Sequence, residues 1–405
     1  MRKITPYKLI TVAFSIIIVI WGCKKLDLTI PNTNSAVDPY AATKLAFGSN
    51  INFDSLSNYA NQTKPNYITL DNTGNNSITN ATATLGRVLF YDKNLSINNT
   101  ISCGSCHKQA FAFSDTALVS SGVLGGLTDR HSMRLINARF SKEEKFFWNE
   151  RAASLEIQTT MPIADHAEMG FSGTQGRPGI DSLLKKLARI NYYKEIFKTV
   201  YGDTVVTESR LQTSLAQFVR SIQSFDSKYD AGRGLVNNDG APFPNFTTTE
   251  NAGKNLFLTP PVFDGNAVRI SGGAGCNGCH KAPEFDIDPN SRNNGIVGII
   301  GSTAIETNNT RAPSLRDLVK ADGTINSRMM HTGQFSSLES VVGHYNNIPN
   351  IAANNNLDNR LRENGIGNKL NLTTTEIAQL VAFIKTLGGA NVYVDKKWAN
   401  PFLVQ

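Results

Sequence analysis

The sequence contains little cysteine: five residues among 405, four of which lie in two short motifs. No pair is left over for a structural disulfide, which excludes a disulfide-stapled scaffold. Long hydrophobic runs are also scarce, because Leu9–Trp21 is the only stretch apolar enough to approach a membrane span. Alternating strand patterns are weak throughout. These absences exclude a polytopic membrane protein and a sheet-based fold, and they favour a mainly α protein.

The N-terminal residues 1–22 have the pattern of a targeting segment. Three basic residues precede the apolar run Leu9–Trp21, which is followed by Gly22 and Cys23. This order is typical of a bacterial lipoprotein signal and predicts cleavage before Cys23 and acylation of its thiol. Trp21 is bulky where a small residue is usual, so an uncleaved anchor helix stays open as the alternative. Both readings predict an exported protein, periplasmic or in the cell envelope and anchored to a membrane.

The overall charge excludes one large class of partners. The formal net charge is +7, and three of the positive charges belong to Arg2, Lys3 and Lys8 in the segment expected to be removed. The charge that remains is small for a chain of this length and forms no basic run. We therefore expect no nucleic-acid partner.

Two Cys-x-x-Cys-His motifs carry the strongest chemical signal in the chain. They occupy residues 103–107 and 276–280. In a c-type haem the two thiols bind the porphyrin covalently and the histidine ligates the iron. A zinc ribbon, the alternative for Cys-x-x-Cys, keeps its two pairs close together and needs no histidine after each pair. The sequence therefore predicts two covalently bound haems, attached through Cys103, Cys106, Cys276 and Cys279, with His107 and His280 as iron ligands.

The two motifs lie in halves that share a sequence pattern. A Gly-basic-x-Leu-Phe run precedes each motif, at residues 86–90 and 253–257. Each half ends in an amphipathic helical pattern, at 207–225 and at 373–387. The sequence predicts two cytochrome c-like domains, each with one haem, packed around an interdomain interface. The predicted boundaries are a signal at 1–22, a tether with irregular structure at 23–80, an N-terminal domain at 81–230, a linker at 231–248 and a C-terminal domain at 249–405.

Further motifs between and after the haem motifs make the chain resemble a known family. These are Phe-Trp-x-x-Arg-Ala-x-Ser-Leu-Glu-x-Gln at 147–158, Glu-Met-Gly at 168–170, Arg-Ala-Pro-Ser-Leu-Arg at 311–316 and Met-His-x-Gly at 330–333. In this order they resemble the bacterial di-haem cytochrome c peroxidases, a family that includes the methylamine-utilisation enzyme that matures a tryptophan-derived quinone. The likeness covers about residues 82–388.

The resemblance implies roles for individual residues. Hydrogen peroxide would react at the first haem, opposite His107, with Glu168 as the acid/base and Gln158 helping to hold peroxide or water. Cleavage of the O–O bond requires a proton to move from the inner to the outer oxygen, which a carboxylate within hydrogen-bond reach can do. Trp148 would lie between the haems on the electron path. Val123 stands where well-studied members carry a displaceable histidine, so the first haem would keep an open face.

Two positions leave alternatives open. The peroxidases place a methionine as the sixth ligand of the second haem, and the matching residue here is Tyr345, as in the quinone-forming relatives. Met330 is the main competitor, followed by Met329 and His344. His131 stands where members commonly carry an asparagine that helps to bind calcium between the domains, and histidine is a poor calcium ligand, so calcium stays open.

The resemblance implies a peroxidase that reduces hydrogen peroxide to water. Electrons would enter at the second haem from a small donor protein, either a cytochrome c or a copper protein. One alternative is a peroxide-driven long-range oxidant of a protein or small organic molecule. Tyr345 favours that alternative, and Gln158 weighs against it because the quinone-forming relatives carry proline there. A pure di-haem electron carrier is the third hypothesis.

Overall fold

The computed structural model describes residues 38–403, and within this range residues 40–403 belong to one compact unit. The predicted signal at 1–22, Cys23 and the tether as far as residue 37 lie outside the described residues, so the lipid anchor stays a prediction. Within the described part of the chain, no helix is long and apolar enough to span a bilayer.

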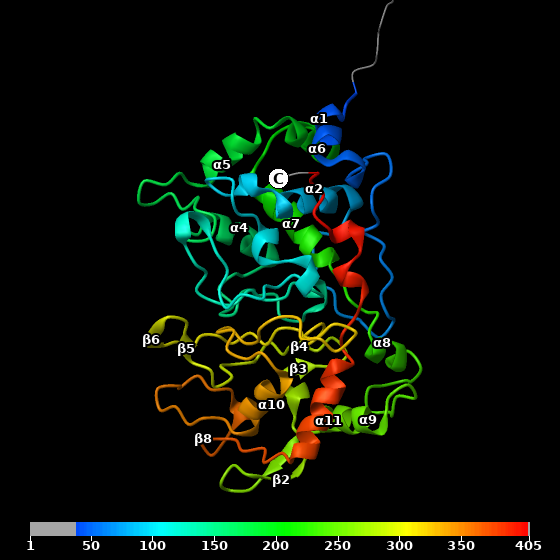
Figure 1. The fold of residues 1–405 in the computed structure, drawn as a ribbon, viewed down its shortest axis with the longest axis vertical. Coiled ribbons are helices and arrows are strands. Elements are labelled where there is room, and N and C mark those ends of the chain that lie inside the picture. The colour runs from blue at the N-terminus through cyan, green and yellow to red at the C-terminus, as the bar shows by residue number, and fades with distance from the viewer. Residues whose placement is uncertain (1–37, 404–405) are drawn as a thin grey trace, which may run out of the picture. The chain divides into compact units, whose positions relative to one another are not determined.

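The described residues are mainly helical, with short antiparallel strand pairs between and beside the helices (Figure 1). The helices are α1 (Ala41–Phe47), α2 (Asn80–Tyr91), α3 (Cys103–Cys106), α4 (Leu155–Ala164), α5 (Ile180–Leu187), α6 (Asn191–Tyr201), α7 (Glu208–Ser221), α8 (Lys228–Arg233), α9 (Thr248–Leu258), α10 (Leu338–Asn346) and α11 (Thr374–Lys385). The strands pair as β1 (Pro261–Phe263) with β2 (Arg269–Gly272), β3 (His280–Lys281) with β4 (Asp286–Ile287), β5 (Gly298–Ile299) with β6 (Ser302–Ile305) and β7 (Arg362–Glu363) with β8 (Ile366–Gly367).

Each half of the chain is built on one crossing of two helices at a glycine. In the first half α2 packs against α7, and a Cβ atom added to Gly86 would lie 1.9 Å from the Ser214 carbonyl oxygen. In the second half α9 packs against α11, and a Cβ atom on Gly253 would lie 1.9 Å from the Gln379 carbonyl oxygen. The glycine of each Gly-basic-x-Leu-Phe run therefore allows the two helices to pack closely.

Local sequence signals explain where these helices begin and end. The Thr373 side chain accepts a hydrogen bond from the Glu376 backbone N–H, and the Glu376 side chain accepts one from the Thr373 backbone N–H, which makes a capping box at the start of α11. Thr207 caps α7 in the same position. The helix predicted over 207–225 ends at Ser221, because the backbone turns to an extended conformation at Ile222.

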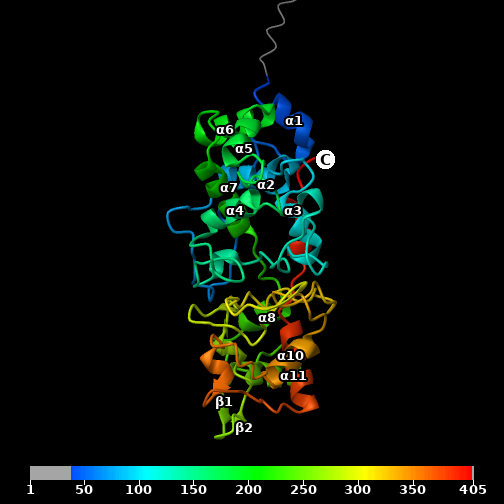
Figure 2. The same cartoon turned by 90° about the vertical axis from the view of Figure 1, so that its left-hand side faces the viewer.

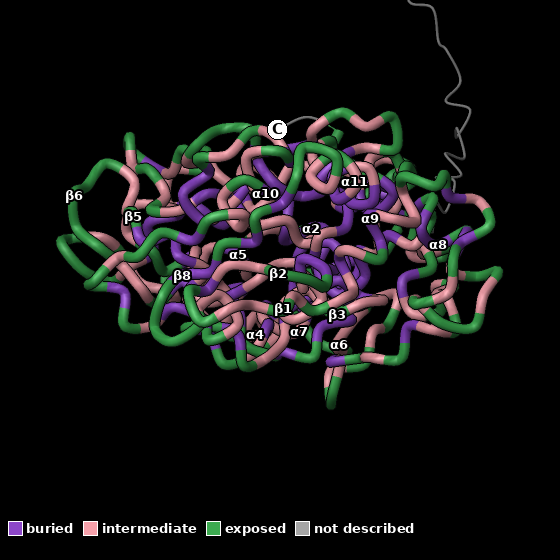
Figure 3. The backbone as a smooth tube through the Cα atoms, turned by 90° about the horizontal axis from the view of Figure 1, so that it is seen from below, coloured by how far each residue is buried: buried purple, intermediate pink, exposed green. Residues whose placement is uncertain are grey.

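Buried apolar side chains form two clusters, one in each half. Figure 3 shows buried backbone in the interior around α2, α9 and α11, whereas β6 lies at the exposed margin. The first cluster contains α2, α4 and α7 side chains, and the second contains α9, α10 and α11 side chains. These two clusters correspond to the two predicted cytochrome c-like domains. The exact domain boundaries stay a prediction.

The C-terminal segment 391–403 leaves the second half and packs on the first (Figures 1 and 2). Trp398 is 2% exposed and belongs to the first cluster. The Tyr91 hydroxyl donates to the Trp398 carbonyl at 2.7 Å, and the Leu403 N–H donates to the Ala46 carbonyl at 3.1 Å. The chain therefore returns to its first half after completing the second.

The predicted N-terminal extension and the predicted linker both contain helical residues. Residues 41–47 of the expected N-terminal extension form α1, which packs against α6. The expected linker 231–248 overlaps α8, and Phe243 within it is 1% exposed in the second cluster.

Candidate active site and the second haem cavity

The first Cys-x-x-Cys-His motif opens into a cavity of about 160 Å³ that Cys106 and His107 line. His107 follows the short helix α3, and its Nδ1 atom lies 2.9 Å from the Phe113 carbonyl oxygen. A carbonyl can only accept, so Nδ1 carries the proton and Nε2 keeps its lone pair for a metal. Burial lowers the pKa of His107, which also favours the neutral, ligating form.

Glu168 lines the same cavity from the loop that follows α4. The Asp165 Oδ1 atom accepts the Glu168 N–H at 2.9 Å, which ties this loop together. The Val123 N–H lies 3.0 Å from the Glu168 carbonyl oxygen, so the loop carrying Val123 packs directly on the Glu168 segment. Val123 is 1% exposed and offers no ligating atom. The backbone around Glu168 is therefore fixed from two sides.

The surroundings of Glu168 raise the pKa of its carboxyl group. Burial, together with the nearby Asp165 and Asp129, raises the pKa of this carboxyl to about 7, whereas Arg151 opposes the rise. The Arg151 guanidinium stacks 3.7 Å above the Phe147 ring and also lines the cavity. At neutral pH Glu168 is therefore populated both as an acid and as a base.

Gln158 and Trp148 complete the predicted set around the first cavity. Gln158 projects from α4 into the cavity that Glu168 and His107 line. Trp148 lines both this cavity and the second one. Its Nε1–H donates to the His131 carbonyl at 2.8 Å, and its ring lies edge-on to His331 with centroids 6.2 Å apart. The indole therefore forms part of the wall that the two cavities share.

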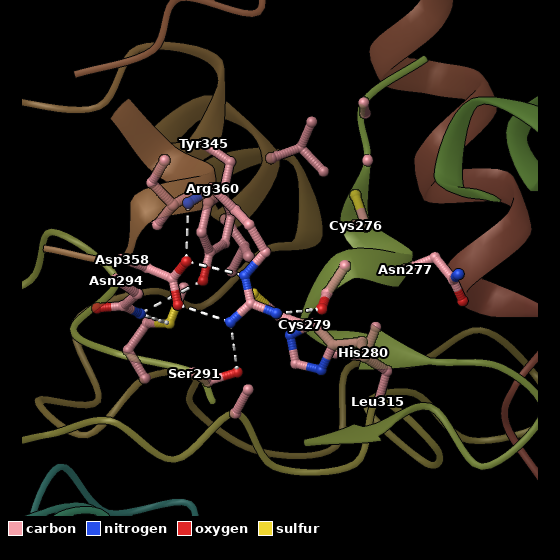
Figure 4. Close-up of a pocket in the computed structure, with 18 of the residues that line it drawn as sticks. Cys276, Asn277, Cys279, His280, Ser291, Asn294, Leu315, Tyr345, Asp358 and Arg360 are labelled. Atoms are coloured by element: carbon pink, nitrogen blue, oxygen red, sulfur yellow. Dashed lines mark hydrogen bonds and ion pairs between the residues drawn. The ribbon is translucent and has the colours of Figure 1, made fainter. Parts of the chain in front are cut away.

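The second motif opens into a larger cavity of about 580 Å³. Cys276, Cys279 and His280 line it on one side, as Figure 4 shows, and Tyr345 lies across from them on α10. Its remaining wall is largely apolar, with contributions from Phe257, Leu315, Leu338, Val342, Leu372, Leu380 and Ile384. Two thiols and an imidazole facing a broad apolar cavity are the donor set and the space that a c-type haem requires.

Both main candidates for the sixth ligand face this second cavity. Tyr345 and Met330 line it, and the Asn294 Nδ2 atom lies 3.3 Å from the Tyr345 hydroxyl oxygen and 3.4 Å from the Met330 sulfur. Burial raises the pKa of Tyr345, and the hydrogen bond from Asn294 opposes that rise. Met329 also lines the cavity, whereas the His344 Nε2 atom lies 2.9 Å from the Asn294 carbonyl oxygen. The structure thus brings Tyr345 and Met330 together and turns His344 to a backbone carbonyl.

Three polar residues at the cavities were not predicted from the sequence. Arg360 reaches into the second cavity and bonds Asp358 at 2.7 Å and Ser291 at 3.1 Å (Figure 4). Arg134 lines both cavities, donates to the Ser314 carbonyl at 3.0 Å, and has its pKa lowered to about 10 by burial. Asn294 follows another asparagine and precedes glycine, a run typical of a tight turn, which is the local signal that points to it.

His131 lies in the wall between the cavities and makes backbone contacts. Its Nδ1 atom lies 3.0 Å from the Ala117 carbonyl oxygen. Its backbone N–H donates to the His331 carbonyl at 2.8 Å. Over residues 38–403 no group of three or more His, Cys, Asp or Glu side chains is placed to hold a metal ion. Calcium between the halves, which the sequence left open, stays untested.

The chain matches a family model described as di-haem cytochrome c peroxidase over residues 80–235. It is 27% identical to the methylamine utilization protein MauG of Methylophilus methylotrophus over 328 residues, covering 79% of this chain and 86% of that protein. It is 26% identical to the cytochrome c551 peroxidase of Nitrosomonas europaea over 322 residues, covering 76% of this chain and 80% of that protein.

Solved structures give the same picture. A MauG-like protein associated with microbial copper homeostasis superposes with a TM-score of 0.63 at 26% identity, covering 84% of this chain and 99% of that one. The diheme peroxidase BthA of Burkholderia thailandensis gives 0.58 at 19% identity, covering 78% and 88%, which supports the fold alone. Cys103 with Cys106 and Cys276 with Cys279 fit the two haem attachment sites of such proteins.

Proposed function

The chain belongs to the di-haem cytochrome c peroxidase and MauG family, and on that premise we propose that it reduces hydrogen peroxide to water with electrons taken in at the second haem. As a member of this family it is an oxidoreductase with two c-type haems. Each peroxide consumes two electrons and two protons and gives two molecules of water. Two one-electron centres on one chain match that requirement.

The observation that carries the proposal is Glu168 in the cavity of the first haem motif. When bound, the haems supply the iron that takes up peroxide and the electrons that reduce it. The chain supplies the proton transfer: the Glu168 carboxylate accepts a proton from the incoming peroxide and returns it to the outer oxygen, so that water can leave. A pKa of about 7 suits both halves of that task. Gln158, on the same cavity wall, offers an amide to orient the peroxide or water.

Trp148 supports the electron path between the two halves. Its side chain lines both cavities, and its carbonyl oxygen accepts the Thr310 and Arg311 N–H groups at 2.9 and 3.0 Å. A residue from the first half is thereby fastened to the second half. We infer that the indole lies on the route by which electrons reach the first haem.

The donor and the location belong to this proposal as well. We infer a small electron-donor protein, a cytochrome c or a copper protein, and an exported, lipid-anchored enzyme held through Cys23. The basic and apolar pattern of residues 1–22 supports the export signal.

Tyr345 favours a second candidate function, a peroxide-driven long-range oxidant of a protein or small organic molecule. A phenolate ligand stabilises the higher oxidation states of iron, whereas a thioether favours the ferrous state. Tyr345 lies on the second cavity, and MauG of Methylophilus methylotrophus is among the similar proteins. Met330 lines the same cavity, and a methionine ligand there would favour the peroxidase.

Steady-state peroxide consumption by the purified holoprotein separates the candidates. The proposal predicts rapid consumption with reduced cytochrome c or a reduced copper protein, and a large loss in Glu168→Gln. Consumption only with organic donors would support the long-range oxidant. Absence of consumption with every donor would support a pure electron carrier and overturn the enzyme assignment.

A further inference from the structure

One amide on the wall of the second cavity contacts both candidate ligands of the second haem. The Asn294 Nδ2 atom donates to the Tyr345 hydroxyl oxygen at 3.3 Å (Figure 4). It also donates to the Met330 sulfur at 3.4 Å. Tyr345 comes from α10, whereas Met330 lies in the loop before that helix. Two side chains with different iron chemistry therefore share one hydrogen-bond donor.

A hydrogen bond accepted by the amide oxygen fixes the orientation of the Asn294 side chain. Its Oδ1 atom accepts the Ile296 N–H at 3.1 Å. A backbone N–H can only donate, so the oxygen must face Ile296 and the NH₂ group must face Tyr345 and Met330. The side chain therefore presents only donors to the cavity.

The backbone that carries Asn294 is held rigidly. Asn293 is fully buried, accepts the Gly295 N–H at 2.8 Å and donates to the Ile296 carbonyl at 3.0 Å. The Asn294 carbonyl accepts a hydrogen bond from His344 Nε2 at 2.9 Å, which ties the turn to α10. Such a fixed turn can hold a side chain at one position on the cavity wall.

Met330 is also held in place by its backbone. Its φ angle is +69°, in the left-handed region that non-glycine residues rarely adopt. A conformation of this kind persists only when the surrounding contacts impose it, and such residues cluster at functional sites. The sulfur is therefore kept at the cavity wall beside Asn294.

We propose that Asn294 is a positioning residue that selects the iron ligand of the second haem, favouring the Tyr345 oxygen over the Met330 sulfur. This inference rests on the proposed function in so far as it requires a second haem, and it takes Tyr345 as the predicted sixth ligand of that haem. An iron-bound tyrosine carries negative charge on its oxygen, whereas a thioether is neutral. Hydrogen bonds to a charged acceptor are roughly twice as strong as those between neutral groups, so a shared donor favours the tyrosine.

Asn294→Asp tests the selection with little change in shape. A carboxylate keeps the oxygen that accepts the Ile296 N–H and removes both N–H donors toward the cavity. Asn294→Ala removes the donors without introducing a group that could itself ligate iron. Asn290→Asp is the matched control, because it makes the same charge change on an exposed asparagine of the same segment. Each variant is purified as the oxidised holoprotein, and its EPR and near-infrared spectra are recorded.

We expect the ratio of tyrosine-ligated to methionine-ligated second haem to fall at least tenfold in both Asn294 variants, about 1.4 kcal/mol, and to stay unchanged in Asn290→Asp. Adding Met330→Leu to Asn294→Ala should abolish the methionine-type spectrum. Wild-type spectra in both Asn294 variants would overturn the inference.

Failure of the inference can be told from failure of the proposed function. A wild-type spectrum unchanged by Tyr345→Phe would overturn both the selection and the assignment of Tyr345 as ligand. Peroxide consumption is measured on the same samples. Its absence in wild type would overturn the peroxidase proposal, whereas its presence beside unchanged spectra would overturn only the role of Asn294.

Discussion

Glu168, the proposed proton-transfer group, lies where the local fold raises the pKa of its carboxyl group. The side chain is removed from water and lies near Asp165 and Asp129, so its pKa rises to about 7. Arg151 is the one cation among the groups that shift this pKa, and it limits the rise. The balance between these charges sets the pH range in which Glu168 can act.

Replacing Arg151 with glutamine should move the pH dependence of the peroxide reaction upward. The positive charge lowers the pKa of Glu168, so its removal raises that pKa above about 7. In the proposed reaction the base form of Glu168 accepts the first proton, so the rate should rise with pH through the Glu168 pKa, and at pH 7 the variant should be slower than wild type. Rates are measured by stopped flow between about pH 5 and 9. Lys142→Gln, at an exposed lysine, is the control, and an unshifted profile for Arg151→Gln would contradict this account.

Replacing Trp148 with phenylalanine should slow electron delivery while the fold is retained. Phenylalanine keeps an aromatic ring at the shared wall but loses the readily oxidised indole and its bond to the His131 carbonyl. We expect the electron transfer from the second haem to the first to fall by about tenfold, or 1.4 kcal/mol in barrier. The measurement is rapid-mixing absorption after half-reduction of the protein. Trp148→Tyr, which keeps an oxidisable ring, should recover part of the rate; equal rates in all three proteins would remove Trp148 from the path.

At the scale of secondary structure elements, each half depends on its own crossing of two helices, and the two crossings are of the same kind. Gly86 and Gly253 each lie where the partner helix leaves no room for a Cβ atom. Gly343 on α10 offers a contrast, because a Cβ atom there would meet nothing within 4 Å. The three positions together test whether a glycine contributes to stability only where two helices cross.

Gly86→Ala and Gly253→Ala should each lower the free energy of unfolding by about 1–3 kcal/mol, since a backbone carbonyl must move to admit the methyl group. Gly343→Ala should raise it by about 0.4–1 kcal/mol, because alanine has less freedom than glycine in the unfolded chain. Urea unfolding followed by far-UV circular dichroism measures all three. Equal effects at the three sites would mean that the helices do not cross as described.

Elements with strong local signals could be predicted from the sequence. The capping box of Thr373 and Glu376, the two haem motifs and the helices at Gly86 and Gly253 depend on residues close together in the chain. Contacts between distant segments could not be predicted in this way. Asn294 meets Tyr345 only because α10 folds back on its turn, and the strand pairs are too short to show an alternating pattern.

The candidate site shows the same difference between local signals and contacts made by distant segments. Glu168, Gln158 and Trp148 could be placed near the first haem only through the resemblance of whole motifs, since no local pattern links them to His107. The roles of these residues stay predictions, although the structure brings them to one cavity. Arg134 and Arg360 could not be predicted because an isolated arginine has no spacing rule that places it at a cavity.

At the scale of the whole described chain, the C-terminal segment joins the second half to the first. Trp398 packs into the first cluster after α11 has completed the second. The Gln109 side chain, two residues beyond His107, donates to the Val392 and Asp395 carbonyls at 3.1 and 2.9 Å. The segment therefore supports the stretch that follows the first haem motif.

Trp398→Ala should destabilise the first half by about 3–5 kcal/mol, the usual loss for a large aromatic side chain removed from a core. The second-haem spectrum should stay that of wild type, because Trp398 does not line the second cavity. Thermal unfolding followed through the absorption of each haem measures this. Val394→Ala, at a side chain 73% exposed in the same segment, should change stability by less than about 0.5 kcal/mol. A similar small effect for Trp398→Ala would mean that the segment does not hold the first half.

The central claim is that an open first haem is served by Glu168, and one rapid-mixing experiment tests it most directly. Oxidised holoprotein is mixed with one equivalent of hydrogen peroxide and its absorption is followed, in wild type and in Glu168→Gln. We predict a fast spectral change in wild type that slows by about 10²- to 10⁴-fold in the variant. Equal rates in the two proteins, or no reaction in wild type, would contradict the account.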